Sequence, residues 1–190
     1  MIKIIHRVNT IHELNKIDKN SGVEIDLRNY ENKIILSHDP GKNGEDFGQY
    51  INNYNHKLLI ANVKEAGIEL KIINELEKHK IINFFLLDVE FPFLLKNFEK
   101  YGEFLSLRFS KYESIETLKY FIGKVSWVWI DTYSDFHLNY DIANILKEYK
   151  ICMVSPSRWE QGNKLNYYLN KLSEFNLNVD AVMIENNELI

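Results

Sequence analysis

Short runs of apolar residues alternate along the chain with longer segments of helical period. Most of the short runs lack polar–apolar alternation, which is typical of strands covered on both faces. We expect strands at 2–5, 23–27, 34–36, 58–63, 84–89, 104–109, 125–130, 151–154 and 181–184. Segment 34–36 is expected to return beside 23–27 as a hairpin, which leaves about eight strands in the repeating pattern.

The segments between these runs carry helix signals. Thr10 and Glu13 have the spacing of a capping box, which predicts a helix beginning at residue 11. Apolar residues recur with helical period over 68–79, so this segment is expected to bury one face. Further helices are expected at 114–121, 140–149 and 163–175, and Pro92 is placed to open one after 84–89.

Strand–helix repetition implies parallel pairing through right-handed crossovers, and eight such strands close a barrel. We therefore predict the α/β class, as a compact single-domain (β/α)₈ TIM barrel over residues 1–190. At 190 residues the chain is short for this fold, so its loops must be tight. A doubly wound open sheet is the alternative, but it usually has a glycine-rich loop after the first strand, where this chain reads His-Arg-Val-Asn at 6–9.

Composition limits the partners and the cellular compartment expected for this protein. The net charge of −4 argues against a nucleic-acid backbone as the main partner. The single cysteine, Cys152, lies in an apolar run and is expected to be a buried apolar residue rather than a nucleophile. We see no signal peptide and no apolar stretch near the ~20 residues of a membrane span, so we expect a cytoplasmic protein without a membrane span.

Polar residues follow the apolar runs at strand after strand. In a closed parallel barrel, chemistry takes place at the carboxyl ends of the strands. A barrel with a purely structural role has no need for polar residues at these positions. The polar residues in question are His6, Arg7, Glu24, Asp26, His38, Asn62, Lys64, Asp88, Arg108, Asp131 and Ser155.

Glu24 and Asp26 lie two residues apart on an expected strand, so both side chains point to the same face. Two buried carboxylates repel each other unless a positive group holds them. A divalent cation with oxygen ligands, Mg²⁺ or Ca²⁺ rather than Zn²⁺, meets this need. Asn62 and Asp88 are further candidate ligands, and the alternative is a half-exposed strand that alternates polar and apolar residues.

Two histidines, His6 and His38, each end a β segment. Histidine titrates near neutral pH, so the pair can serve as general base and general acid, although a single histidine is more often structural. Arg7 offers a planar fork that fits a phosphate group, and Lys64 and Arg108 are further phosphate-binding candidates. Together with the carboxylates, these residues make an inventory for phosphoryl chemistry.

Several aromatic residues are candidates for lining the barrel mouth, although core packing is their commoner role. They are Tyr112, Trp127, Trp129, Tyr133 and Trp159.

Three motifs carry a family resemblance, and these are His-Arg at 6–7, Glu-Ile-Asp at 24–26 and Ser-His-Asp-Pro at 37–40. In order and spacing they resemble the signature of the glycerophosphodiester phosphodiesterases, which belong to a superfamily of phospholipase C-like barrels. The resemblance implies a phosphodiester substrate and a bound Ca²⁺ or Mg²⁺. It implies acid–base roles for His6 and His38, cation binding by Glu24 and Asp26, and phosphate binding by Arg7.

The chain departs from the family pattern at several positions. Val8 replaces a usual glycine, and Asn62 stands where the family has a third carboxylate. Only residues 41–57 occupy the place of a sizeable insertion, which implies a more open pocket. Other segments are similar to motifs of a short branch of this superfamily, found among bacterial surface-polysaccharide genes. This similarity implies that Asn62 is a feature of the branch. The similar segments are 62–67, 87–92, 108–113, 129–131 and 154–156.

Three functional hypotheses follow. The first is a metal-dependent phosphodiester hydrolase acting on a small-molecule or glycan-linked phosphodiester. The second, motivated by Asn62, is a non-catalytic barrel that binds a phosphorylated sugar or nucleotide-sugar intermediate of surface-polysaccharide biosynthesis. The third is an isomerase or lyase that uses Asp88, Arg108 and Asp131.

Overall fold

The structure is a computed structural model and describes residues 1–161 and 164–185. Its strands are β1 (Ile2–Ile5), β2 (Gly22–Tyr30), β3 (Lys33–Leu36), β4 (Glu45–Asp46), β5 (Leu59–Val63), β6 (Phe84–Leu87), β7 (Ser106–Phe109), β8 (Trp127–Ile130), β9 (Lys150–Val154) and β10 (Ala181–Ile184). Its helices are α1 (Ile11–Leu14), α2 (Phe47–Asn52), α3 (Glu69–Lys78), α4 (Phe91–Tyr101), α5 (Ile115–Phe121), α6 (Tyr140–Leu146) and α7 (Leu165–Ser173), with short 3₁₀ turns η1 (Gly102–Phe104) and η2 (Pro156–Trp159).

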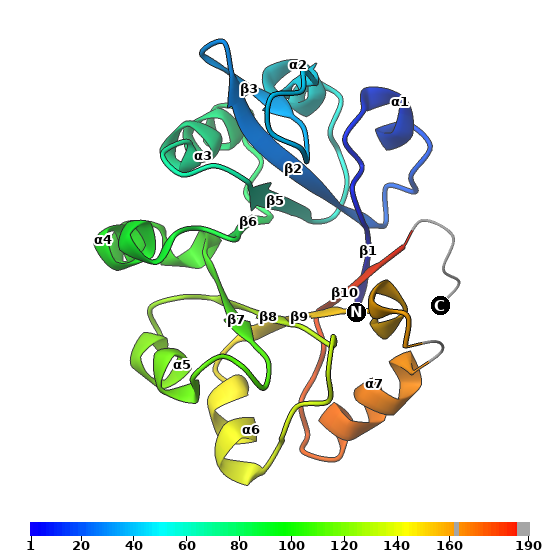
Figure 1. Ribbon diagram of the computed structural model, residues 1–190, viewed down its shortest axis with the longest axis vertical. Helices are drawn as coiled ribbons and strands as arrows, with labels where there is room; N and C mark the ends of the chain where they lie inside the picture. Colours follow the sequence, from blue (N-terminus) through cyan, green and yellow to red (C-terminus); the bar gives the residue numbers. More distant parts are fainter. Residues whose placement is uncertain (162–163, 186–190) are drawn as a thin grey trace.

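Eight parallel strands form one curled sheet in the order β6-β5-β2-β1-β10-β9-β8-β7. The helices follow one another in chain order around the outside of this sheet (Figure 1). The predicted α/β class, with parallel strands and intervening helices, is therefore confirmed. None of the described helices has the length and apolar character needed to cross a bilayer.

The ring of strands is open between β6 and β7. Among the described residues, one isolated bridge joins Leu86 of β6 to Leu105, the residue before β7. The Ser106 hydroxyl at the start of β7 also donates to the Leu86 carbonyl at 2.8 Å. Both strands are only four residues long, and the stagger of a curled sheet leaves them little overlap. The expected closed barrel is thus observed as an open sheet compatible with a TIM-like barrel.

The expected hairpin return is confirmed by β3, which pairs antiparallel with β2. Glu31 and Asn32 make the two-residue turn with positive φ angles, as this class of hairpin requires. Strand β2 runs to Tyr30, three residues beyond the predicted end. After β3, the Ser37 amide donates to the Asp26 carbonyl at 2.9 Å, which holds the segment that follows beside the carboxyl half of β2.

Apolar residues form two clusters, one between the sheet and the helices and a smaller one inside the curl. Trp127 and Trp129 belong to the inner cluster, where Trp127 stacks on Phe85 with ring centroids 4.6 Å apart. Cys152 is fully buried in the same cluster, and burial raises its pKa, as expected for an unreactive core thiol. The inner cluster fills the curl below the polar residues at the strand ends.

Candidate active site

A cavity of about 140 Å³ lies at the carboxyl ends of the parallel strands. Apolar residues from the inner cluster contribute to its lining, and these are Leu87, Trp129, Val154 and Met183. The remaining lining residues are polar, charged or aromatic, and these are His6, Arg7, Glu24, Asp26, Asn62, Lys64, Asp88, Arg108, Asp131, Tyr133, Arg158 and Trp159. The structure therefore brings together every residue to which the sequence assigns a catalytic, phosphate-binding or cation-binding role, except His38.

Glu24 is a buried carboxylate of the cavity, with 1% of its surface exposed. Its Oε2 accepts a hydrogen bond from the Arg7 amide at 2.8 Å, and its Oε1 accepts one from Asn62 Nδ2 at 2.8 Å. Burial, helped by repulsion from Asp26, raises the pKa of Glu24 to about 7. A positive group placed beside Glu24 would therefore favour its charged form.

Asp26 is fully buried beside Glu24. Asn9 Nδ2 donates to Asp26 Oδ2 at 2.9 Å, and Asn9 Oδ1 accepts a hydrogen bond from the Asp26 backbone amide at 2.8 Å. Two cations approach the carboxylate, with Lys64 Nζ 3.3 Å from Oδ1 and Arg7 Nε 3.8 Å from Oδ2. Asn9 was not among the residues predicted from sequence, although it directly follows the His-Arg motif.

Two buried oxygen atoms of this cluster lack hydrogen-bond partners among the described residues. They are Asp26 Oδ1, which has only its ion pair with Lys64, and Asn62 Oδ1. Asn62 donates to Glu24 through its nitrogen, so its oxygen is left over as an acceptor. Such buried acceptors are costly unless a positive group meets them.

His6 directly follows β1, and its side chain is only 10% exposed. Its Nε2 lies 4.0 Å from Glu24 Oε2, and its Nδ1 lies 3.2 Å from Glu185 Oε1. Burial lowers the pKa of His6, against the opposing effect of Glu185, which favours the neutral ring. Arg158 Nε also contacts Glu185 Oε1, at 3.3 Å, so this carboxylate links the histidine to a further cation.

Backbone strain accompanies the polar cluster. Arg7 is the second residue after β1, and Asp88 directly follows β6. Both adopt positive φ angles, of 53° and 61°. This conformation is unfavourable for residues other than glycine and is concentrated at functional sites. At Arg7 it accompanies the amide hydrogen bond to Glu24.

His38 lies in a neighbouring hollow of about 490 Å³ rather than in the central cavity. Its side chain is 41% exposed, and its Nδ1 lies 2.8 Å from Asp39 Oδ1. The Arg28 guanidinium donates to the backbone carbonyls of His38, at 3.1 Å, and Lys64, at 2.8 Å. Asn9 lines the hollow of His38 and also bonds Asp26 in the cavity, so the two spaces are neighbours.

A second charged cluster occupies another part of the cavity wall. Arg108 Nε and Nη2 donate to Asp88 Oδ1, at 2.8 Å and 2.5 Å, and Arg108 Nη1 contacts Asp131 Oδ2. Trp129 Nε1 donates to Asp131 Oδ1 at 3.2 Å. The predicted roles of Asp88 in cation binding and Arg108 in phosphate binding stay predictions, but this mutual pairing favours a different use of both residues.

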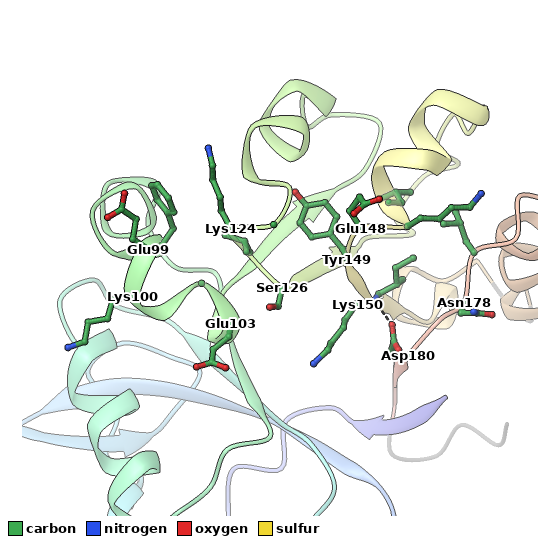
Figure 2. Close-up of a pocket in the computed structure, with 18 of the residues that line it drawn as sticks. Glu99, Lys100, Glu103, Lys124, Ser126, Glu148, Tyr149, Lys150, Asn178 and Asp180 are labelled. Carbon is green, nitrogen blue, oxygen red and sulfur yellow. Dashed lines mark hydrogen bonds between the residues drawn. The ribbon is translucent and has the colours of Figure 1, made fainter.

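A larger groove, of about 730 Å³, opens at the amino-terminal end of strands β7 to β10 (Figure 2). It is lined by as many acidic as basic residues, and all of them are exposed. They are Glu99, Lys100, Glu103, Lys124, Lys147, Glu148, Lys150 and Asp180. Asp180 accepts a hydrogen bond from the Ile151 amide at 2.8 Å, which fixes the β9–β10 edge of the groove.

Comparison with known proteins shows the fold. No family model matches the chain, and no curated protein matches it by sequence. A glycerophosphoryl diester phosphodiesterase from Parabacteroides distasonis matches it in structure with a TM-score of 0.60 at 9% identity, over 97% of this chain and 82% of the other. An N-(5′-phosphoribosyl)anthranilate isomerase from Pyrococcus furiosus matches with a TM-score of 0.54 at 9% identity, over 97% and 88% of the two chains.

Proposed function

We propose that this protein is a divalent-cation-dependent phosphodiester hydrolase. The observation that carries the proposal is the convergence of two buried carboxylates, a largely buried histidine and two cations in one cavity at the carboxyl ends of the strands. The structural likeness to a glycerophosphoryl diester phosphodiesterase supports it at the level of the fold.

The cavity's donor set fits a hard divalent cation. Among the described residues, no three Asp, Glu, His or Cys side chains are grouped closely enough to hold a metal, so a third protein ligand has to come from another residue type. Asn62 can supply it, because its buried Oδ1 lacks a hydrogen-bond partner in the described structure, as does Asp26 Oδ1. Glu24, Asp26 and Asn62 would hold the ion, with oxygen ligands suited to Mg²⁺ or Ca²⁺.

The bound cation would supply electrostatic stabilisation to the phosphoryl oxygens. Arg7 and Lys64 flank Asp26 and would bind the non-bridging oxygens of the phosphodiester. Their charges also limit the repulsion between the substrate and the two carboxylates.

His6 would act as the general base. Its neutral ring accepts the proton of the nucleophile, which is water or a neighbouring hydroxyl of the substrate, as the new P–O bond forms. Glu185 beside Nδ1 orients the ring and stabilises the charge that it gains. The bond from phosphorus to the leaving oxygen breaks, and that oxygen takes a proton from a general acid.

We assign the general acid to His38, as the sequence predicts. Its position in the neighbouring hollow requires the leaving group to extend from the cavity past Asn9. Asp39 Oδ1, 2.8 Å from Nδ1, holds the ring in place for this role.

The first test is a screen of phosphodiesters, including bis(p-nitrophenyl) phosphate and glycerophosphoethanolamine, with Mg²⁺, Ca²⁺ or Mn²⁺ and with EDTA. We expect turnover that requires a cation and stops in EDTA. Turnover that is unchanged in EDTA contradicts the cation assignment, and absence of turnover under every condition contradicts the hydrolase.

Asn62 favours a second candidate, a non-catalytic barrel that binds a phosphorylated sugar, because an amide ligand adds no negative charge to the cation site. This candidate predicts calorimetrically detectable binding of a sugar phosphate together with absence of turnover in the same screen. The paired cluster of Asp88, Arg108 and Asp131 is the basis of the third hypothesis, an isomerase or lyase. That hypothesis predicts loss of function in Asp131→Asn and retained function in Glu24→Gln.

A further inference from the structure

The proposed hydrolysis leaves one part of the cavity wall without a role. Asp88, Arg108 and Asp131 come from the ends of β6, β7 and β8, and all three line the cavity. Arg108 and Asp88 are partly accessible, with side chains 37% and 28% exposed, whereas Asp131 is buried. The cluster therefore presents hydrogen-bonding atoms to a ligand while its own charges are paired.

This pairing determines what the cluster can bind. The guanidinium of Arg108 is shared by two carboxylates, so the three residues together carry a net negative charge. A phosphate group would be repelled here and attracted to Arg7 and Lys64 instead. A neutral ligand with several hydroxyl groups can use both the remaining acceptor sites of the carboxylates and the N–H groups of the arginine.

An aromatic wall stands beside the cluster. Tyr133 lines the cavity, Tyr112 stacks on it with centroids 5.7 Å apart, and Trp159 meets it at 88° with centroids 5.4 Å apart. Tyr112 is 69% exposed and Trp159 is 39% exposed, so part of each ring is accessible to a ligand and not buried in the core. The Tyr133 hydroxyl and Ser110 Oγ form a 2.9 Å hydrogen bond, which fixes the central ring of the wall.

The three rings come from three successive loops. Tyr112, Tyr133 and Trp159 follow β7, β8 and β9, next to the strand ends that carry Arg108 and Asp131. Rings and polar cluster are therefore parts of one rim. The enclosed volume of about 140 Å³ suits a phosphate-sized group, so a larger substituent on the phosphorus would lie against this rim.

We propose that this rim is a subsite for a sugar ring, the polyhydroxylated part of the phosphodiester substrate. The inference rests on the proposed function and specifies its substrate class. Exposed aromatic faces pack against the C–H face of a sugar, and Asp88 and Arg108 bond its hydroxyl groups while the phosphate lies near Lys64. On this assignment, Arg108 contacts the sugar rather than the phosphate.

The test compares two p-nitrophenyl phosphodiesters that differ in the second alcohol, one the 6-hydroxyl of glucose and the other methanol. The wild-type protein should show a higher kcat/KM for the glucose ester. Tyr112→Ala and Trp159→Ala should each reduce this preference by about fivefold, the order of a single aromatic contact. Tyr140, a 73% exposed tyrosine on α6, provides the matched control, and Tyr140→Ala should keep the wild-type preference.

Binding measurements separate this proposal from the proposed hydrolysis. If neither ester is cleaved, the hydrolase fails, and calorimetry then compares the methyl diester of glucose 6-phosphate with dimethyl phosphate. Tighter binding of the glucose diester that weakens in Tyr112→Ala supports the subsite independently of turnover. Equal kcat/KM, or equal affinity, for the glucose and methanol compounds overturns the proposed subsite. A preference for glucose that persists in both Tyr112→Ala and Trp159→Ala also overturns it.

Discussion

The two ends of the curled sheet both carry hollows lined by charged residues, but they hold their charges differently. At the carboxyl end, Glu24 and Asp26 are 1% and 0% exposed and are fixed by hydrogen bonds. At the amino end, Glu103 and Lys150 are exposed on the wall of a groove about five times larger (about 730 Å³ against 140 Å³; Figure 2).

The difference lies in desolvation. Charges on the open groove stay hydrated and cost the fold little, whereas burying two neighbouring carboxylates is unfavourable without compensation. The raised pKa of Glu24 and the positive φ angle of Arg7 are signs of this cost. The smaller cavity is therefore the better candidate for chemistry, and each prediction below pairs a substitution at a buried position with one at an exposed position.

The largest effect is expected at His6. Removing a general acid or base typically costs 10²–10⁴-fold in rate, so His6→Ala, and likewise His38→Ala, should lower kcat by a factor of this order. The matched control is His12→Ala, because His12 is an exposed histidine on α1. Steady-state kinetics with the best phosphodiester of the screen measure the effect, and near wild-type kcat in His6→Ala refutes its role as base.

A smaller effect is expected on stability. Because the pKa of Glu24 rises from 4.5 to about 7 on folding, the folded state holds a proton that the unfolded state has lost between these pH values. The free energy of unfolding should therefore fall as pH rises from about 4.5 to 7, by up to about 3 kcal/mol from this group.

Urea unfolding in EDTA at several pH values measures this dependence. The Glu24→Gln variant should lose this part of the slope, because glutamine does not titrate. Glu103→Gln, on the exposed groove, should keep the wild-type slope. The same slope in Glu24→Gln as in the wild type would show that the buried carboxylate does not titrate in this range.

The smallest effect is expected at Lys64. If its ammonium binds a phosphate oxygen, Lys64→Ala should lower kcat/KM by about tenfold or more, as for loss of one charged hydrogen bond. Lys64→Arg should recover part of the loss because it keeps the charge. Lys150→Ala is the exposed control, and equal kinetics in Lys64→Ala and Lys150→Ala would remove Lys64 from the phosphate site.

Local patterns in the sequence predict the strands and the members of the cavity well. Residues such as Glu24 and Asp26 directly follow or interrupt an apolar run, so the parallel topology alone places them at one end of the sheet. The predicted hairpin return at 34–36 is also confirmed, as the antiparallel pair β2 and β3. Helix α2 was missed, because it has only six residues and its buried face is limited to Phe47, Tyr50 and Ile51.

Long-range relations were not predictable in the same way. The opening between β6 and β7 depends on the stagger of strands that are distant in the sequence from their partners around the ring. The pairing of His6 with Glu185 joins the two ends of the chain, and Asp88 meets Arg108 rather than the carboxylates on β2. Likewise, the position of His38 outside the cavity follows from the path of the chain after β3, which no local pattern records.

The central claim is that Glu24, Asp26 and Asn62 hold a divalent cation in the buried cavity, and calorimetric titration tests it most directly. Titrating Mg²⁺, Ca²⁺ and Mn²⁺ into metal-free wild-type protein should reveal one site for at least one of these ions. That site should be lost in Glu24→Gln and retained in Glu103→Gln. Absence of binding by the wild type, or undiminished binding by Glu24→Gln, would contradict the account.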